Sequence, residues 1–272
     1  MSRARFECKR RVPDWIVVVI LGVIEGITEF LPVSSTGHLL VAEHWLPRQS
    51  DLFNVIIQCG AVVAVLPLFQ DRIKKFLFRW SEPATRDYFI KLVAAFAITG
   101  AGGLILKKLK FELPKELLPV AMALLVGGVC FLAIERWLRG KTFHENITWS
   151  IAIAVGLGQL IAIIFPGASR SGTTILLALL LGLSRPAATE FSFLVSIPTM
   201  LAAGGMEMLK ALRHPTGAQE NWTLLVLATV VSGIVSFIAV KWLLRFVQTH
   251  TFVGFGWYRV IAGGALLFLA LR

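Results

Sequence analysis

Long apolar stretches without charged residues alternate with short polar breaks along this chain. Four stretches, at 52–70, 117–134, 147–169 and 221–240, contain no Asp, Glu, Lys or Arg. Each is near or above the roughly 20 residues that a helix needs to cross a bilayer. Glycines, prolines and charge clusters divide the chain into about ten predicted helical segments. These segments run over 14–31, 35–46, 52–69, 87–107, 115–138, 147–165, 171–183, 187–209, 221–247 and 253–271.

The lengths of these segments predict an all-α polytopic membrane protein. Six of them are long and mostly uncharged, and we expect them to span the bilayer. The segments at 35–46 and 171–183 are too short to span, and each follows a proline-containing polar break. A helix, a polar break and a short helix together are typical of a re-entrant pair, so we expect two such pairs.

The two polar breaks belong to an internal repeat. Ser34-Ser35-Thr36-Gly37 aligns with Ser169-Arg170-Ser171-Gly172, and positions 34 and 169 differ by 135, close to half the chain. We therefore predict two half-repeats, 1–140 and 141–272, each with one re-entrant pair and three spans. An odd number of crossings inverts the second half, so the breaks can meet near the midplane. Irregular backbone at that depth must be buried in protein or line a wet cavity, which predicts a shared polar site.

Composition and charge support a membrane location. Hydrophobic residues make up 56% of the chain and charged residues 16%, which excludes an ordinary soluble domain. The 27 basic and 16 acidic residues give a net charge of +11, but basic clusters such as Arg3–Arg11 flank the apolar stretches. We interpret them as contacts with anionic membrane lipids and not as a nucleic-acid surface. Their distribution leaves the orientation in the membrane undecided, and the sequence leaves open a homodimer.

Two acidic residues in the first predicted helix are candidates for chemistry. Glu25 and Glu29 are four residues apart, so both carboxylates lie on one helical face. Their mutual repulsion predicts a positive partner, either a divalent cation or Arg170. The alternative is that hydroxyl or backbone donors satisfy both carboxylates at the helix end. We favour a functional role, because a hydroxyl-rich break follows directly.

The two breaks carry hydroxyls and close-approach glycines at the starts of helices. The first supplies Ser34, Ser35, Thr36, Gly37 and His38, and the second supplies Ser169, Arg170, Ser171, Gly172 and Thr174. Helix N-termini present unpaired N–H groups that suit phosphate. Two of them with an arginine fork would suit a diphosphate. Some of the Ser and Thr residues are expected to act only as helix caps. Glu190 and Arg259 are weaker candidates.

Two long motifs in this order give a family resemblance over essentially the full length of the chain. The chain resembles the bacterial undecaprenyl-diphosphate phosphatases, which are the bacitracin-resistance proteins. The motifs are Glu25-Gly-Ile-Thr-Glu29-Phe-Leu-Pro-Val-Ser-Ser35-Thr-Gly-His38 and Pro166-Gly-Ala-Ser-Arg170-Ser-Gly-Thr-Thr174, with support from Phe53-Asn-Val-Ile-Ile-Gln58 and Glu190-Phe-Ser-Phe193. Departures are the longer basic lead at 3–11 and Thr173, where the family commonly has a smaller residue.

The resemblance implies an activity and roles for these residues. The enzyme would remove the terminal phosphate of undecaprenyl diphosphate in the bacterial inner membrane and regenerate the carrier lipid for cell-wall synthesis. Bacitracin resistance would follow. Glu25 and Glu29 would hold a divalent cation, Mg²⁺ or Ca²⁺, and Arg170 would bind the diphosphate. Ser35 would be the nucleophile or a phosphate ligand, with Thr36 beside it and His38 as acid or base. The substrate-binding set would be Ser34, Thr36, Gly37, Ser169, Ser171, Gly172 and Thr174.

Two other classes of protein are alternatives to an enzyme. Inverted repeats with broken helices are also a transporter architecture, so the same site could carry polyprenyl phosphate across the membrane. A pure carrier has no need of two carboxylates beside a hydroxyl, and for this reason we favour the hydrolase. A purely structural membrane protein is the third and weakest hypothesis. The sequence does not decide whether Ser35 or water attacks phosphorus.

Overall fold

A computed structural model of the chain describes residues 12–109, 116–213 and 221–271. Within these ranges it contains α-helices, one 3₁₀-helix and a single isolated β-bridge, which confirms the predicted all-α class. The basic lead Arg3–Arg11 lies outside the described residues. The helices are α1 (Asp14–Thr28), α2 (Ser35–Trp45), α3 (Asp51–Val65), η1 (Leu66–Phe69), α4 (Gln70–Phe78), α5 (Pro83–Lys108), α6 (Leu117–Trp137), α7 (Trp149–Ile164), α8 (Arg170–Leu180), α9 (Arg185–Arg213), α10 (Trp222–Phe246) and α11 (Val253–Ala270).

Six helical stretches in the described ranges are long and apolar enough to cross a membrane, which confirms the predicted number of spans. They are Asp51–Phe78, Pro83–Lys108, Leu117–Trp137, Arg185–Ala211, Trp222–Phe246 and Val253–Ala270. Because α3, η1 and α4 run on without interruption, they form one span that ends nine residues later than the predicted 52–69. The charged residues after Phe69 were expected to end this helix, but they continue it as the exposed helix α4.

The stretch at 147–169 is long enough by composition to span, yet it does not form one spanning helix. Helix α7 ends at Ile164, and Gly167 then adopts φ +98, a left-handed conformation that favours glycine. A Cβ at Gly167 would also lie only 2.5 Å from the Val120 carbonyl oxygen. The chain therefore turns here and returns as the short helix α8, as predicted for a re-entrant pair.

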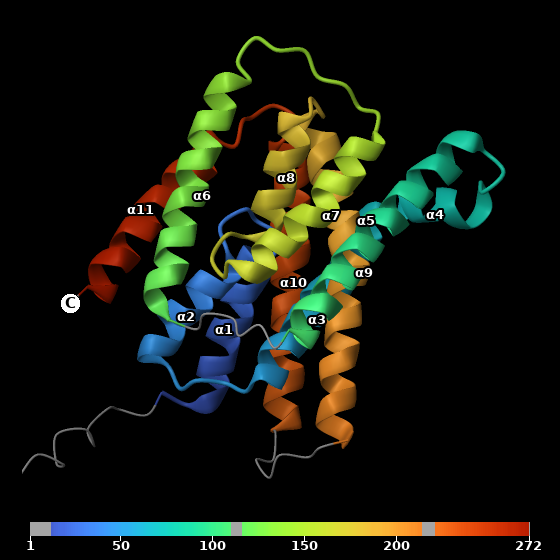
Figure 1. Ribbon diagram of the computed structural model, residues 1–272. Helices are drawn as coiled ribbons and strands as arrows, with labels where there is room; N and C mark the ends of the chain where they lie inside the picture. Colours follow the sequence, from blue (N-terminus) through green and yellow to red (C-terminus); the bar gives the residue numbers. More distant parts are fainter. Residues whose placement is uncertain (1–11, 110–115, 214–220, 272) are drawn as a thin grey trace, which may run out of the picture.

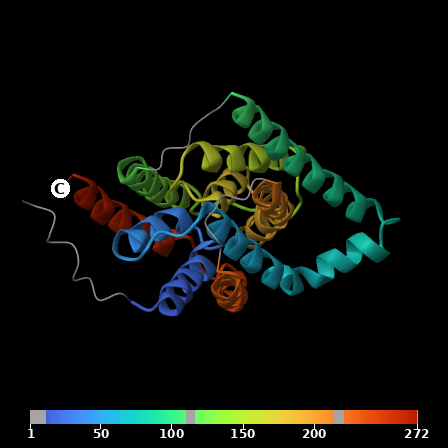
Figure 2. The ribbon, with the colours of Figure 1, turned by 90° about the horizontal axis from the view of Figure 1, so that it is seen from below.

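The two helix pairs α1–α2 and α7–α8 run in opposite directions. In Figure 1, α1 rises from the lower side and α2 returns to it, whereas α7 descends from the upper side and α8 returns upward. Viewed from below, α2, α7 and α8 occupy the middle of the molecule, while α4 and the start of α5 extend away from it (Figure 2). This arrangement is consistent with the predicted inverted repeat; the boundary at residue 140 stays a prediction.

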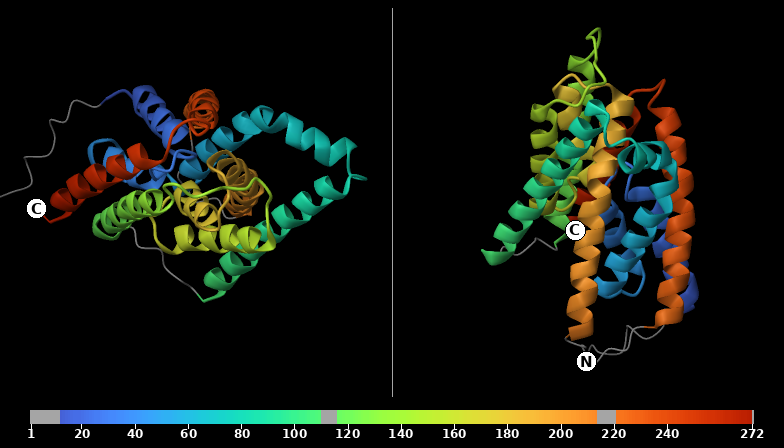
Figure 3. Two further views of the ribbon diagram at one scale, coloured as in Figure 1. Left: turned by 90° about the horizontal axis from the view of Figure 1, so that it is seen from above. Right: turned by 90° about the vertical axis from the view of Figure 1, so that its right-hand side faces the viewer.

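Each re-entrant pair packs on a span from the other predicted half. Helix α1 packs against α10, and α7 packs against α5. A Cβ at Gly22 would lie 2.7 Å from the Ala228 carbonyl oxygen, and one at Gly156 would lie 2.8 Å from the Ala95 carbonyl oxygen. Glycine at both positions therefore allows helix backbones to approach closely. The side view in Figure 3 shows α9 and α10 running nearly the full height of the molecule.

Aromatic packing fixes the first polar break against the helix bundle. Phe30 directly follows Glu29, the C-cap of α1, and is buried. Its ring makes an edge contact with Phe193 of α9 at a centroid distance of 5.0 Å, and Phe193 contacts Phe69 of η1 at 6.4 Å. Such aromatic contacts stabilise a defined geometry as well as burying apolar area. The break that follows Glu29 is thus held in place from one side.

Candidate active site

The two polar breaks begin their short helices with the same local structure. Ser34 and Ser169 have φ values of 74 and 70, which non-glycine residues rarely adopt. Each serine is the N-cap of the next helix: Ser34 Oγ accepts from Gly37 N at 3.4 Å and Ser169 Oγ from Gly172 N at 3.2 Å. These caps satisfy one helix-end N–H each. The repeat in the sequence therefore corresponds to a repeat in conformation.

A direct hydrogen bond joins the two breaks. The Ser171 hydroxyl donates to the carbonyl oxygen of Leu31 at 3.1 Å and lies 3.2 Å from the Ser169 hydroxyl. These three residues are buried, so water does not compete for the contact. The first turn of α8 is thereby placed against the segment that leads from α1 to α2.

Glu29 receives two hydrogen bonds at the end of α1. Ser35 Oγ donates to Glu29 Oε2 at 2.6 Å, and Gln58 Nε2 of α3 donates to the same oxygen at 3.2 Å. The short distance to Ser35 is typical of a bond to an ionised carboxylate. Glu29 is thus oriented by one donor from its own polar break and one from a membrane span.

Arg170 of the second break lies beside Glu29 of the first. Arg170 Nη2 is 3.7 Å from Glu29 Oε1, at the long end of ion-pair distances. The Glu29 side chain is only 4% exposed, whereas that of Arg170 is 26% exposed. The guanidinium therefore neutralises a buried carboxylate and still faces open space, where it can bind an anion.

A cavity of about 230 Å³ lies over these groups. Both polar breaks contribute to its wall, together with Gln58 of α3 and the end of α7. Its lining residues are Glu29, Ser34, Ser35, Thr36, Gln58, Ala162, Ile163, Pro166, Gly167, Ser169 and Arg170. A hydroxyl bound to a carboxylate, next to a guanidinium and two helix N-termini, is suited to phosphoryl transfer. The two motifs are therefore brought together into one polar pocket.

Four of the predicted substrate-binding residues lie behind the cavity wall. Gly37 and Gly172 donate backbone N–H groups to the capping serines, and Ser171 bonds to Leu31 as described above. Thr174 donates its hydroxyl within α8, at 2.8 Å from the Arg170 carbonyl oxygen. None of the four is among the residues that line this cavity. Their part in substrate binding stays a prediction.

The His38 imidazole contacts the Ser34 backbone and Tyr258. Its Nδ1 lies 2.7 Å from the Ser34 carbonyl oxygen, and its Nε2 lies 2.5 Å from the Tyr258 hydroxyl. The two rings are stacked at a centroid distance of 5.6 Å. His38 and Tyr258 line a separate, mostly apolar pocket between α2 and α11. The assignment of His38 as acid or base stays a prediction.

Glu25 is a fully buried carboxylate. Its side chain is 0% exposed, and neither carboxylate oxygen has a hydrogen bond of good geometry among the described residues, although Glu29, Gln58 and Arg170 are close enough to interact with it electrostatically. An unpaired buried carboxylate is costly unless it is protonated or binds a cation. Together with Glu29 it offers hard oxygen ligands of the kind that Mg²⁺ and Ca²⁺ prefer. Among the described residues, no three acidic, histidine or cysteine side chains lie so that they could hold a metal ion together.

Glu190, one of the weaker candidates, lies outside this site. Its Oε1 accepts from Arg72 Nε at 2.6 Å, so it forms an ion pair between η1–α4 and α9. Conversely, Gln58 and Tyr258 contact predicted site residues but were not predicted to do so. Gln58 could have been found from the sequence as a polar residue within a charge-free span. No sequence signal connected Tyr258 to His38, because 220 residues separate them.

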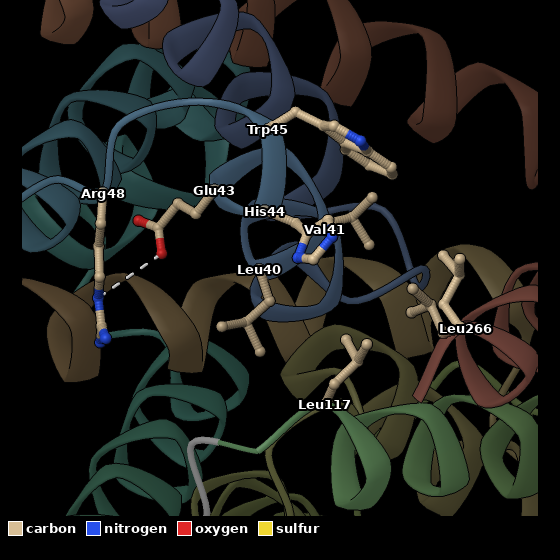
Figure 4. Close-up of a pocket in the computed structure, with 9 residues that line it drawn as sticks. Leu40, Val41, Glu43, His44, Trp45, Arg48, Leu117 and Leu266 are labelled. Atoms are coloured by element: carbon tan, nitrogen blue, oxygen red, sulfur yellow. Dashed lines mark ion pairs between the residues drawn. The ribbon is translucent and has the colours of Figure 1, made fainter. Parts of the chain in front are cut away.

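A third pocket lies at the ends of α2, α6 and α11 (Figure 4). Its polar wall consists of His44 and of Glu43, which pairs with Arg48 at 3.9 Å; Leu40, Val41, Leu117 and Leu266 form the apolar wall. It contains none of the predicted site residues. Several of the predicted site residues instead line the cavity between the two breaks.

Comparison with known proteins gives a consistent result along nearly the whole chain. Residues 18–265 match the family model described as "Bacitracin resistance protein BacA". A protein of Rhizobium etli named undecaprenyl-diphosphatase is 51% identical over 258 residues, which are 94% of this chain and 97% of that protein. Proteins of the same name from Xanthomonas euvesicatoria and Xylella fastidiosa are each 47% identical over 255 residues; these cover 93% of this chain and 96% and 98% of the relatives.

Proposed function

This chain belongs to the BacA bacitracin-resistance family, and we propose that the cavity between its two polar breaks is where it hydrolyses undecaprenyl diphosphate. The protein is a bacterial multi-pass membrane enzyme, an undecaprenyl-diphosphatase. One observation carries the assignment of the site: Ser35, Glu29 and Arg170, from opposite halves of the chain, meet at a single cavity.

Ser35 is the proposed nucleophile, with Glu29 as its base. A hydroxyl within hydrogen-bond distance of a carboxylate has the geometry that activates it for attack. As Ser35 Oγ bonds to the terminal phosphorus, its proton passes to Glu29 Oε2 and the anhydride P–O bond breaks. Undecaprenyl phosphate leaves with the electron pair of that bond. Water then cleaves the phosphoserine, Glu29 returns the proton to Ser35 Oγ, and inorganic phosphate is released.

Arg170 is proposed to neutralise the diphosphate. Phosphoryl transfer depends mainly on positioning and on stabilising charge on the equatorial oxygens. The exposed part of the guanidinium faces the cavity, and a fork of donors suits two phosphate oxygens. Ser34, Thr36 and Ser169 line the same cavity and complete the proposed cradle. His38 acts in this proposal by holding the Ser34 carbonyl and not by transferring a proton.

A divalent cation, Mg²⁺ or Ca²⁺, is proposed to bind at Glu25 and Glu29. The support is the fully buried carboxylate of Glu25, which makes no hydrogen bond of good geometry among the described residues and lies one helical turn from the like-charged Glu29. Two carboxylates with phosphate oxygens are a common ligand set for such ions. When bound, the cation would offset negative charge on the carboxylates and the diphosphate. The Arg170 guanidinium, the Gln58 amide and the Ser35 hydroxyl keep Glu29 oriented in its absence.

Phosphate release by the purified protein tests this proposal. The protein in detergent receives undecaprenyl diphosphate or farnesyl diphosphate with Mg²⁺ or Ca²⁺, and inorganic phosphate is measured. Arg170→Ala is expected to lower kcat/KM by about 10³-fold or more, as for other charge-stabilising arginines. The control is Arg139→Ala, an exposed residue just beyond α6, which should leave the rate unchanged.

Two results would contradict the proposal. Release unaffected by both Arg170→Ala and Glu29→Ala would remove the site assignment. Lipid binding by the wild-type protein without any phosphate release would favour the carrier hypothesis instead.

A further inference from the structure

Arg259 of α11 is a buried cation that the proposed reaction does not use. Its side chain is 0% exposed and is among the largest fully buried side chains of the described residues. Burying a guanidinium in the membrane is costly unless its donors are satisfied. No carboxylate lies within ion-pair distance of it among the residues that the structure describes. Something other than an ion pair therefore compensates its burial.

Backbone carbonyls from both polar breaks surround the Arg259 guanidinium. Nη1 donates to the Pro32 carbonyl oxygen of the first break at 3.2 Å. Nη2 donates toward the carbonyl oxygens of Gly167 and Ala168 in the second break, at 3.2 and 3.0 Å. It also lies 3.3 Å from the Ala123 carbonyl oxygen of α6. The Arg259 side chain thus connects the two polar breaks, at Pro32 and at Gly167, which are 135 residues apart. It also connects both breaks to helix α6.

Space for this side chain depends on Gly127 of α6. A Cβ at Gly127 would overlap Nη2 of Arg259, and the next residue, Gly128, lets α6 approach the α11 backbone closely. Gly264 of α11, by contrast, has open space where a Cβ would lie. The chain therefore offers one glycine whose substitution would displace Arg259 and another that serves as a matched control.

Arg259 does not line the cavity that contains Ser35 and Arg170. Its contacts instead fix the backbone from which these residues extend: Pro32 precedes Ser35 by three residues, and Ala168 precedes Arg170 by two. We propose that Arg259 is a positioning residue that holds the two breaks at the spacing required to align Ser35 and Glu29 with Arg170. This inference rests on the proposed function of that cavity.

The expected effect is on turnover more than on substrate binding. Misplacement of reacting groups by about 1 Å can cost about 10²-fold in rate. Arg259→Met keeps the side-chain volume but has no donors, so we expect kcat to fall about 10²-fold while KM changes less than about threefold. Arg259→Lys has one donor group and cannot reach all three segments, so its kcat should lie between those of the wild type and Arg259→Met.

A double-mutant cycle with Arg170→Ala separates positioning from a general loss of stability. If Arg259 acts by aligning Arg170, then adding Arg259→Met to the Arg170→Ala variant should lower its kcat by less than about threefold. If Arg259 had only a structural role, Arg259→Met would lower kcat by the same factor in the wild type and in the Arg170→Ala variant. The folded fraction of each variant is measured by size exclusion and thermal unfolding in detergent, and kcat is expressed per folded molecule.

Gly127→Ala tests the same inference without altering Arg259. We expect it to lower kcat about tenfold or more, because one methyl group displaces the guanidinium, whereas Gly264→Ala should match the wild type. This variant also carries the test if Arg259→Met does not fold. Folded Arg259→Met with at least one-third of wild-type kcat, equal losses in both Arg170 backgrounds, or Gly127→Ala indistinguishable from Gly264→Ala would overturn the inference. If Arg170→Ala itself is fully active, the proposed site fails instead.

Discussion

Ser34 and Ser169 share a rare left-handed backbone conformation, and each accepts a hydrogen bond from the N–H three residues ahead. The pair shows how one short motif, used twice, makes two similar helix starts. Because α1 and α7 run in opposite directions, these two starts face a common cavity. The cost of the positive φ is offset by the cap and by the burial of both serines.

This geometry predicts an unusual ranking of substitutions at Ser169. Ser169→Ala removes the cap and keeps the strained φ, so it should cost about 1 kcal/mol of unfolding free energy. Ser169→Gly also removes the cap but adopts positive φ freely, so it should cost little. The control is Ser50, the N-cap of α3, whose φ is −69. Thermal unfolding should show that the unfolding free energies of the Gly and Ala variants differ more at position 169 than at position 50. The excess should be about 1 kcal/mol. Equal differences would contradict a strained Ser169.

Gln58 should contribute to catalysis through Glu29. Gln58→Met keeps the approximate shape and removes the donor to Glu29 Oε2. A hydrogen bond to a charged group is worth about 1.5–3 kcal/mol, so kcat/KM should fall about tenfold or more. Gln248→Met, at an exposed residue beyond α10, should have no effect. If the two variants have the same kcat/KM, Gln58 does not orient the carboxylate.

The cation proposal predicts a stability difference at Glu25. Wild-type protein should unfold at a higher temperature when Mg²⁺ or Ca²⁺ is added, because a ligand of the native state stabilises it. Glu25→Gln should lose that increase, and without cation it should be more stable than the wild type, because a buried unpaired carboxylate is removed. Glu207→Gln, at a half-buried residue near the end of α9, serves as control. The same cation-induced increase in wild type and Glu25→Gln would exclude Glu25 as a ligand.

A phosphoserine intermediate should form if Ser35 is the nucleophile. Substrate labelled in its terminal phosphate is mixed with excess enzyme and quenched in acid within one turnover. Label should appear on the wild-type protein and be absent from Ser35→Ala, because the Oγ–P bond forms before water attacks. Ser81→Ala, at an exposed residue before α5, should label normally. Complete phosphate release without any labelled protein would assign the attack to water.

The sequence predicted much of this architecture because apolar length and polar breaks are properties of single segments. The spacing of positions 34 and 169 also led to the prediction that the two breaks meet, since an inverted repeat lets them enter from opposite faces, and Ser35 and Arg170 do line one cavity. Contacts that depend on how the helices pack in three dimensions could not be predicted from the sequence alone. Nothing in the spacing of His38 and Tyr258 indicates that their rings stack, and nothing in the position of Arg259 identifies backbone carbonyls as its partners.

Residue type alone also gave incomplete information about the polar breaks. The family resemblance implies that Ser171 and Thr174 bind the substrate, and this stays a prediction. The Ser171 hydroxyl bonds to the Leu31 carbonyl oxygen of the other break, and the Thr174 hydroxyl bonds to carbonyl oxygens one turn earlier in α8, as Ser and Thr side chains in helices often do. Gln58 lines the cavity, but the sequence did not single it out, because the apolar residues of its span predict that helix without any role for Gln58.

The most direct test of one shared cavity is an experimental structure with a non-hydrolysable diphosphate bound, such as the farnesyl methylene-bisphosphonate. The account predicts that the phosphonate groups lie between the two breaks, with oxygens in hydrogen-bond contact with both Ser35 and Arg170. A headgroup bound in the pocket at the ends of α2, α6 and α11, or contacting only one of the two breaks, would contradict it.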